Sequence, residues 1–276
     1  MTTNNLVVII LAYSRIENVK KSIRSFSETN IPNAKLVVLL DRNEKTNIAV
    51  DLSIYCNSHN VQFEVSGGLG HDLVYKKALL NHNDSKWKWI VNDSIILNSS
   101  KLIFLNSSLM DKSNYDCIFL TNSKAKLENS PIWYATRTGW TILKSKSIPK
   151  DFISNNMFKN FPQLMFFYKP NINFFELQLS LDVNKTTASY WIDEFWSTWY
   201  VDFIDALYKL GYDELKVKKN SIYHADKNYF FSIISLFNWP KSFYSEFKID
   251  YVKYLSKRQF LYFKLFRKVD QLLDRK

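Results

Sequence analysis

The feature that most constrains the fold is an uninterrupted apolar run near the start of the chain, LVVIILAY, from Leu6 to Tyr13. A run of this kind, without polar alternation, is typical of a strand buried on both faces of a parallel sheet. A helical pattern follows at once, and Ser14 and Glu17 have the spacing of a capping box, in which each side chain satisfies a free amide of the first helical turn. The chain therefore opens with a strand, a turn and a capped helix.

Strands and helices alternate through the first half of the chain. Apolar, strand-like segments recur as KLVVLLD, VQFEV, WKWIV and DCIFLT, and helical patterns occupy residues 71–80 and 101–110. This alternation indicates βαβ units with parallel strands. A chain of 276 residues with 46% hydrophobic content is long enough for one large core and an appendage. We therefore expect an α/β domain whose pattern becomes less regular from Asn122 to Lys185.

Polar residues stand where the predicted parallel strands end, and ligands of open parallel sheets bind beyond these ends. An aromatic ring there can stack on a base, a carboxylate can accept a base N–H, and an acidic loop can hold a divalent ion that bridges phosphates. These residues predict a nucleoside diphosphate site. They are Tyr13, Ser14 and Arg15 after the first strand, Asp41 after the second, the glycines near Gly70, and Asn92, Asp93 and Ser94 after the fourth.

The order of these features resembles the inverting glycosyltransferases of the GT-A fold, especially family 2. VVIILAYSRIENVKKSIRSF is similar to the family's opening strand, P-T-Y-N-R turn and helix, and VVLLD is similar to its second strand. GLGHDLVYKKALL resembles the glycine-led helix before the metal-binding strand, and WKWIVNDSIIL stands where the family carries its DxD-type motif. IDEFWSTWYVDFIDALYKLGY, followed by SIYH, resembles the acidic catalytic motif and the late histidine.

The resemblance implies a mostly parallel, Rossmann-type sheet in a GT-A-like catalytic domain over residues 1–235. Residues 1–121 would form its nucleotide-binding half and residues 122–235 its acceptor half. The implied activity is direct, inverting transfer of a sugar from a nucleoside diphosphate sugar, in particular a UDP-sugar. The acceptor would be a cell-surface polysaccharide, such as capsule or lipopolysaccharide, or a lipid-linked glycan.

The resemblance also assigns roles to individual residues. Tyr13 and Asp41 would bind the base, and Asp93 and His224 would hold Mn²⁺ or Mg²⁺ at the diphosphate. Hard cations are best held by carboxylates, and the motif here keeps only one, Asp93, between Asn92 and Ser94. The full set of predicted nucleotide-binding residues is Ala12, Tyr13, Arg15, Asp41, Gly70 and Asn92.

The proton of the acceptor hydroxyl must go to a carboxylate in an inverting displacement. Asp193, Glu194 and Asp202 are the candidates, on a helical pattern that starts near Trp191 and ends at Gly211. We expect Asp193, because it lies beside the apolar stripe and in the first helical turn, where aligned backbone dipoles favour an ionised carboxylate. Simple charge stabilisation of the helix start remains the alternative.

Positive charge collects near the end of the chain. The net charge is +11, and residues 241–276 hold ten Lys and Arg against four Asp and Glu, a net +6. Helical spacing between Lys257 and Leu273 predicts a basic amphipathic helix in a tail over 236–276. Such a helix suits docking on an anionic membrane surface. Packing on the domain or on a second subunit, as in a homodimer, is the equal alternative.

Other features set the compartment and the rival functions. Cys56 and Cys117 lack disulfide or metal spacing, and no segment approaches ~20 consecutive apolar residues. We expect a cytoplasmic protein that can bind peripherally at the inner face of the cell membrane. We also expect His71 to be an ordinary surface residue. The rivals are a catalytically degenerate GT-A-like binding or assembly subunit and a nucleic-acid-binding protein. We expect no nucleic-acid partner, because the excess charge lies in the tail and not on the α/β body.

Overall fold

The computed structural model describes residues 4–121, 138–148, 163, 164, 166, 172–184, 200–227 and 253–273, without the side chains of 223–227, 266, 267, 270, 271 and 273. The chain divides into two compact units. The first comprises Met1–Asn156 and Pro162–Thr186, and the second comprises Met157–Phe161 and Thr187–Lys276.

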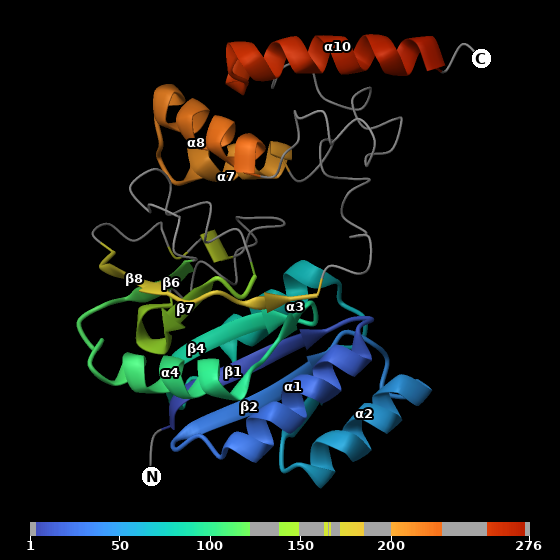
Figure 1. The fold of residues 1–276 in the computed structure, drawn as a ribbon, viewed down its shortest axis with the longest axis vertical. Coiled ribbons are helices and arrows are strands. Elements are labelled where there is room, and N and C mark those ends of the chain that lie inside the picture. Colours follow the sequence, from blue (N-terminus) through green and yellow to red (C-terminus); the bar gives the residue numbers. More distant parts are fainter. Residues whose placement is uncertain are drawn as a thin grey trace. The chain divides into compact units, whose positions relative to one another are not determined.

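A seven-stranded sheet forms the centre of the first unit, in the order β3-β2-β1-β4-β7-β6-β8 (Figure 1). The first four strands of this order run parallel, as do β6 and β8, while β7 is antiparallel to both of its neighbours. The mostly parallel α/β sheet predicted from the sequence is therefore confirmed. The strands are β1 Asn4–Ala12, β2 Ala34–Leu40, β3 Gln62–Val65, β4 Ser85–Asn92, β6 Cys117–Thr121, β7 Thr141–Lys144 and β8 Phe174–Gln178.

Strand β1 is buried on both faces, as its unbroken apolar run predicts. Leu6, Val8 and Ile10 belong to the core that the sheet shares with α1 (Ile16–Thr29), α2 (Asn47–Ser58) and α4 (Ser99–Met110). The residues between them point to the other face, because successive side chains of a strand alternate. The helix α3 (His71–Leu80) contacts β1 and β4. A small antiparallel pair, β5 (Ile95–Ile96) with β9 (Asp182–Val183), completes the described part of this unit.

A buried lysine links the central strand to α3. Lys88 of β4 is fully buried, and its ammonium donates to the carbonyl oxygens of Leu79, at 2.6 Å, and Asn81. It also donates to Oδ1 of Asn83 at 3.3 Å. A buried ammonium needs such acceptors, and Lys88 in turn satisfies carbonyl groups at the C-terminal end of α3.

Some expectations are wrong or incomplete. The N-cap of α1 is Arg15, and its side chain makes no capping hydrogen bond, so the capping box expected at Ser14 and Glu17 is wrong. The sequence pattern predicted neither α2 nor β8 and β9. Helix α2 exposes Val50 and Ile54 while it buries Leu52. Its apolar residues therefore follow no single face.

Three helices make up the described part of the second unit: α7 (Tyr200–Lys209), α8 (Glu214–Lys227) and α10 (Lys257–Leu273). Helix α7 gives way to Gly211 with a φ of 79°, and α10 has the bounds predicted from its spacing. The side-chain amide of Gln259 donates to the carbonyl oxygen of Ile222 at 3.0 Å, which fastens α10 to α8. Among the described residues, no helix combines the length and the hydropathy that crossing a membrane requires.

Gly139 should be intolerant of any side chain. Its φ is +91°, and a Cβ built on it would lie 2.2 Å from Cδ1 of Ile95. We expect Gly139→Ala to lower the free energy of unfolding by about 2–5 kcal/mol, because a left-handed alanine costs about 1–2 kcal/mol and overpacking about 1–3 kcal/mol. Urea denaturation measures this loss.

Gly68→Ala is the matched control. Gly68 has a φ of +80° but nothing within 4 Å of its built Cβ. Gly68→Ala should therefore lower the free energy of unfolding only by the cost of a left-handed alanine, about 1–2 kcal/mol. Equal losses for the two variants would contradict the packing argument.

Candidate functional site

Four parallel strands end side by side at one edge of the sheet. Ala12, the last residue of β1, pairs with Leu40 of β2, and Leu40 pairs with Val65 of β3. Leu11 pairs with Asn92, the last residue of β4. The segments that follow these strands are therefore neighbours. They carry the predicted residues Ala12, Tyr13, Arg15, Asp41, Gly70, Asn92 and Asp93.

Asp93 holds the turn between β1 and α1. Its Oδ2 accepts hydrogen bonds from the backbone N–H groups of Tyr13, Ser14 and Arg15, at 2.9, 2.9 and 3.0 Å. Its Oδ1 accepts one from the Arg15 guanidinium at 3.2 Å, and the residue is 2% exposed. Amides at a helix start need an acceptor, and the helix dipole favours an anion there. Asp93 thus anchors the turn that leads into α1, through the N-cap residue Arg15 and the two residues before it.

The β4–β5 turn, which carries Asp93, is itself braced from two sides. The side-chain amide of Asn18, in α1, donates to the backbone carbonyl of Asp93 at 3.0 Å. Asn184, which follows β9, donates from its side chain to Oδ1 of Asn18 at 3.2 Å and from its backbone to the carbonyl of Ser94 at 2.8 Å. The β4–β5 turn is therefore fixed by α1 and by the chain beyond β9.

Asp41 ties β2 to the glycine loop. Its Oδ1 accepts from the Ser66 hydroxyl at 2.5 Å, and its Oδ2 accepts from the backbone N–H of Gly70 at 3.0 Å. Gly67, Gly68 and Gly70 all have φ between 80° and 85°, which glycine adopts at little cost. The loop is exposed, whereas Asp41 is half-buried. Each carboxylate oxygen can accept a further bond, so Asp41 is oriented and still able to bind a donor.

Two aromatic rings meet beside this loop. The rings of Tyr13 and His71 stack with their centroids 5.8 Å apart and their planes 23° from parallel. Tyr75, one helical turn further along α3, is tilted against His71 at 6.2 Å. Burial raises the pKa of the Tyr75 phenol, which keeps it neutral.

Sequence reasoning missed two residues of this edge. His71 was expected to be an ordinary surface residue, but it is half-buried against Tyr13. Arg42 is exposed, and its guanidinium donates to the backbone carbonyl of Tyr13 at 3.4 Å. Both directly follow residues that were singled out, Gly70 and Asp41, and this adjacency was the available signal.

The remaining predicted residues belong to the second unit. Asp193 and Glu194 lie outside the described residues. Asp202 is half-buried in the first turn of α7. His224 lies within helix α8, and its side chain is not among those described. Their roles stay predictions.

A divalent metal fits poorly on the described residues. Among them, no three His, Cys, Asp or Glu side chains lie close enough together to hold an ion. Oδ2 of Asp93 already accepts three N–H groups, and the Arg15 guanidinium beside Oδ1 would repel a cation. These contacts favour a turn-holding role for Asp93 over the metal-ligand role that the resemblance implies.

A separate hollow of about 370 Å³ lies over α2 and β3. Its walls include Val50, Ile54 and Phe63, and none of the predicted site residues lines it. The polar residues at the strand ends, and not this hollow, are therefore the candidate site.

Solved structures share the fold of this chain, which is that of GT-A-type glycosyltransferases. No protein-family model and no curated protein matches the sequence. The crystal structure of S. aureus TarS matches with a TM-score of 0.61 and 13% identity over 96% of this chain and 54% of TarS. This chain thus spans about half the length of TarS.

Two further matches contain ligands. S. aureus TarS 1–349 in complex with UDP has a TM-score of 0.51 and 13% identity, over 90% of this chain and 76% of that one. Mannosyltransferase PcManGT from Pyrobaculum calidifontis, in complex with GDP-Man and Mn²⁺, has a TM-score of 0.53 and 10% identity, over 80% and 69%. At such identities the likeness establishes the fold, and the GT-A-like α/β class expected from the sequence is confirmed.

Removal of the Asp93 charge should loosen the turn. In Asp93→Asn, one carboxylate oxygen that accepts N–H groups becomes an amide that donates. We expect the free energy of unfolding to fall by about 3 kcal/mol, because each buried donor left without an acceptor costs about 1–3 kcal/mol. Urea denaturation monitored by tryptophan fluorescence measures this change.

Asp116→Asn is a matched carboxylate-to-amide control. Asp116 is half-buried and accepts from the Ser147 hydroxyl at 2.6 Å and the backbone N–H of Asn173 at 3.1 Å. Asp116→Asn should lower the free energy of unfolding by about 1 kcal/mol, the usual contribution of a hydrogen bond. A loss as large as that of Asp93→Asn would contradict a special role for the turn.

Proposed function

We propose that this chain is a glycosyltransferase that moves a sugar from a nucleoside diphosphate sugar, in particular a UDP-sugar, onto a cell-surface polysaccharide or a lipid-linked glycan. The observation that carries the proposal is the strand-end edge, where an oriented carboxylate, a stacked tyrosine and a glycine loop lie together. The shared fold of TarS, solved with UDP and with UDP-GlcNAc, and of PcManGT, solved with GDP-Man, supports it.

The base would bind between Asp41 and Tyr13. A uracil ring N–H can donate to a free lone pair of the Asp41 carboxylate, whose direction is set by Ser66 and Gly70. The Tyr13 ring is held against His71 and offers a flat apolar face for stacking. Guanine also presents ring N–H groups, so the choice of UDP over GDP rests on the resemblance.

The diphosphate needs positive charge when it departs. Arg42 is exposed at the same edge and offers a guanidinium. Asn92 and Ser94 add polar groups at the end of β4. Mn²⁺ accompanies the donor in PcManGT, whereas in this chain Asp93 is bonded to the β1–α1 turn.

The transfer itself would be a direct displacement that inverts the anomeric centre. The acceptor oxygen bonds to the anomeric carbon while the bond from that carbon to the diphosphate oxygen breaks, and its electron pair leaves with the diphosphate. Asp193 would take the acceptor proton as general base. Glu194 and Asp202 are the alternative bases.

The second candidate function is a degenerate binding or assembly subunit that keeps the fold without the chemistry. Asp93 is the only carboxylate of the DxD-like motif and is bonded to the turn. This favours the degenerate subunit. Hydrolysis of UDP-sugars, measured with and without Mn²⁺, separates the two. Nucleotide binding without turnover of any sugar nucleotide supports the subunit.

Nucleotide choice can be tested by thermal shift and calorimetry with UDP, GDP and CMP. We expect UDP to bind best and to stabilise the fold by ~2.7 kcal/mol at a hundred times its Kd. Asp41→Asn should raise the Kd for UDP about tenfold to hundredfold, because a hydrogen bond to a charged group contributes about 1.5–3 kcal/mol. Binding should persist in EDTA, because Asp93 is bonded to the β1–α1 turn and to the Arg15 guanidinium, which would repel a cation.

Asp84→Asn is the control for this series, because Asp84 is exposed and lies 3.9 Å from Lys35, away from the site. It should leave the Kd for UDP unchanged. Equal affinity of wild type and Asp41→Asn would remove Asp41 from the base site. Binding that depends on Mn²⁺ would restore the metal role of Asp93.

The general base can be identified from three alanine variants, at Asp193, Glu194 and Asp202. We expect Asp193→Ala to lower kcat about 10²–10⁴-fold, the usual contribution of a positioned base, while the Kd for UDP stays unchanged. Transfer to an acceptor glycan is the measurement. Loss of transfer in Asp202→Ala alone would move the role to Asp202.

A further inference from the structure

Helix α10 sorts its side chains by chemistry. Gln259 and Phe263 are 1% and 4% exposed, and Gln259 is bonded to the carbonyl of Ile222. The exposed side chains among those described in α10 belong to leucine, lysine or arginine. They are Lys257, Arg258, Leu261, Lys264, Leu265, Lys268 and Leu272, and we call them together the α10 face.

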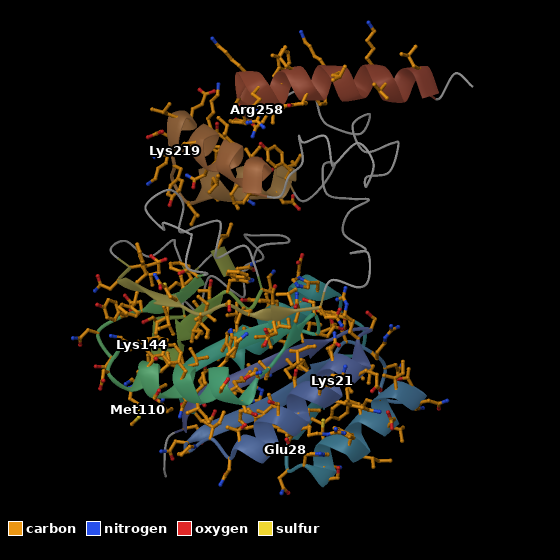
Figure 2. The ribbon with its side chains drawn as sticks, in the orientation of Figure 1. Lys21, Glu28, Met110, Lys144, Lys219 and Arg258 are labelled. Atoms are coloured by element: carbon orange, nitrogen blue, oxygen red, sulfur yellow. The ribbon has the colours of Figure 1, made fainter. Side chains whose placement is uncertain are left out.

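The leucines of the α10 face form one stripe. At about 3.6 residues per turn, Leu261, Leu265 and Leu272 project within roughly 40° of one another. They are 67%, 52% and 57% exposed, which is a large apolar area for three neighbouring positions in water. By the same geometry Lys264 flanks the stripe on one side and Arg258 on the other. Arg258, at the start of α10, is labelled in Figure 2.

We propose that the α10 face docks on the surface of an anionic lipid bilayer. The leucines would enter the boundary between headgroups and acyl chains, and the flexible basic side chains would reach lipid phosphates. Helix α10 contains five Lys and Arg and one acidic residue, Asp270, and residues 241–276 carry a net +6. This charge complements a negatively charged leaflet.

A second copy of the chain fits this face poorly. In a two-fold symmetric dimer the same patch contacts itself. Four bases, Lys257, Arg258, Lys264 and Lys268, would then face four identical bases, and the only acidic residue in the sequence of α10 is Asp270. An anionic bilayer supplies the missing negative charge and an apolar layer at once.

The test is co-sedimentation of the full-length chain with phosphatidylcholine vesicles, with and without phosphatidylglycerol. We expect binding only to the anionic vesicles, with a loss as salt rises from about 0.1 M to about 1 M and the screening length shortens from about 10 Å to about 3 Å. Lys264→Glu/Lys268→Glu should lower the partition coefficient at least tenfold, since each base contributes about fivefold. Leu261→Gln/Leu265→Gln should also lower it at least tenfold, because two apolar side chains would no longer enter the boundary between headgroups and acyl chains.

Matched variants keep the result specific to this helix. Lys21→Glu/Arg24→Glu reverses two exposed bases on α1, where Lys21 is labelled in Figure 2, and Leu215→Gln removes a leucine of α8 that is 80% exposed. Both should sediment like wild type. Circular dichroism and UDP binding should be unchanged in all variants, which separates a failure of docking from misfolding and from a failure of the proposed function.

Three outcomes would overturn the proposal. The first is equal sedimentation with neutral and anionic vesicles, or none with either. The second is wild-type binding by both α10 variants. The third is a concentration-dependent dimer, seen by light scattering and lost in the α10 variants, which would make the face a subunit interface.

Discussion

A single buried carboxylate sets the geometry of the candidate site. Asp93 accepts three consecutive backbone N–H groups and a guanidinium, all from the turn between β1 and α1. An ionised group at 2% exposure is tolerable only with partners of this kind. Because Asp93 directly follows β4, the bonds also fix where that strand ends relative to β1. The position of Tyr13, and with it the stacked pair with His71, follows from this one interaction.

The edge of the sheet therefore has a closed part and an open part. Around Asp93 the donors and acceptors are matched within the protein, with Asn18 and Asn184 completing the network. Around Asp41 the glycine loop is exposed, and the carboxylate keeps free lone pairs. A ligand gains most where protein groups are oriented but not saturated. This contrast supports Asp41 as the proposed base contact and leaves Asp93, the motif residue that a metal would need, less available.

Local patterns predicted the elements well, and distant pairing limited the rest. The buried run of β1 and the bounds of α10 follow from the spacing of their apolar residues, and the bounds of α3 follow from the glycines before it. The anchor of the turn before α1 could not be predicted this way, because Asp93 lies 78 to 80 residues further along the chain. Ser14 and Glu17 satisfied the local rule for a capping box, yet the N-cap of α1 is the next residue, Arg15. His71 was missed for the same reason, since its partner Tyr13 is remote in sequence.

The two proposals constrain each other through the acceptor. A free nucleotide sugar and a soluble glycan can both reach the strand ends by diffusion, so neither requires the exposed leucines of the α10 face. A lipid-linked glycan is different, because its lipid is confined to a bilayer and its sugar lies at the headgroup level. An enzyme held at that surface meets the acceptor at a high effective concentration. Docking through Leu261, Leu265 and the surrounding bases would therefore favour the lipid-linked acceptor over the free polysaccharide, while base recognition at Asp41 would be the same for either.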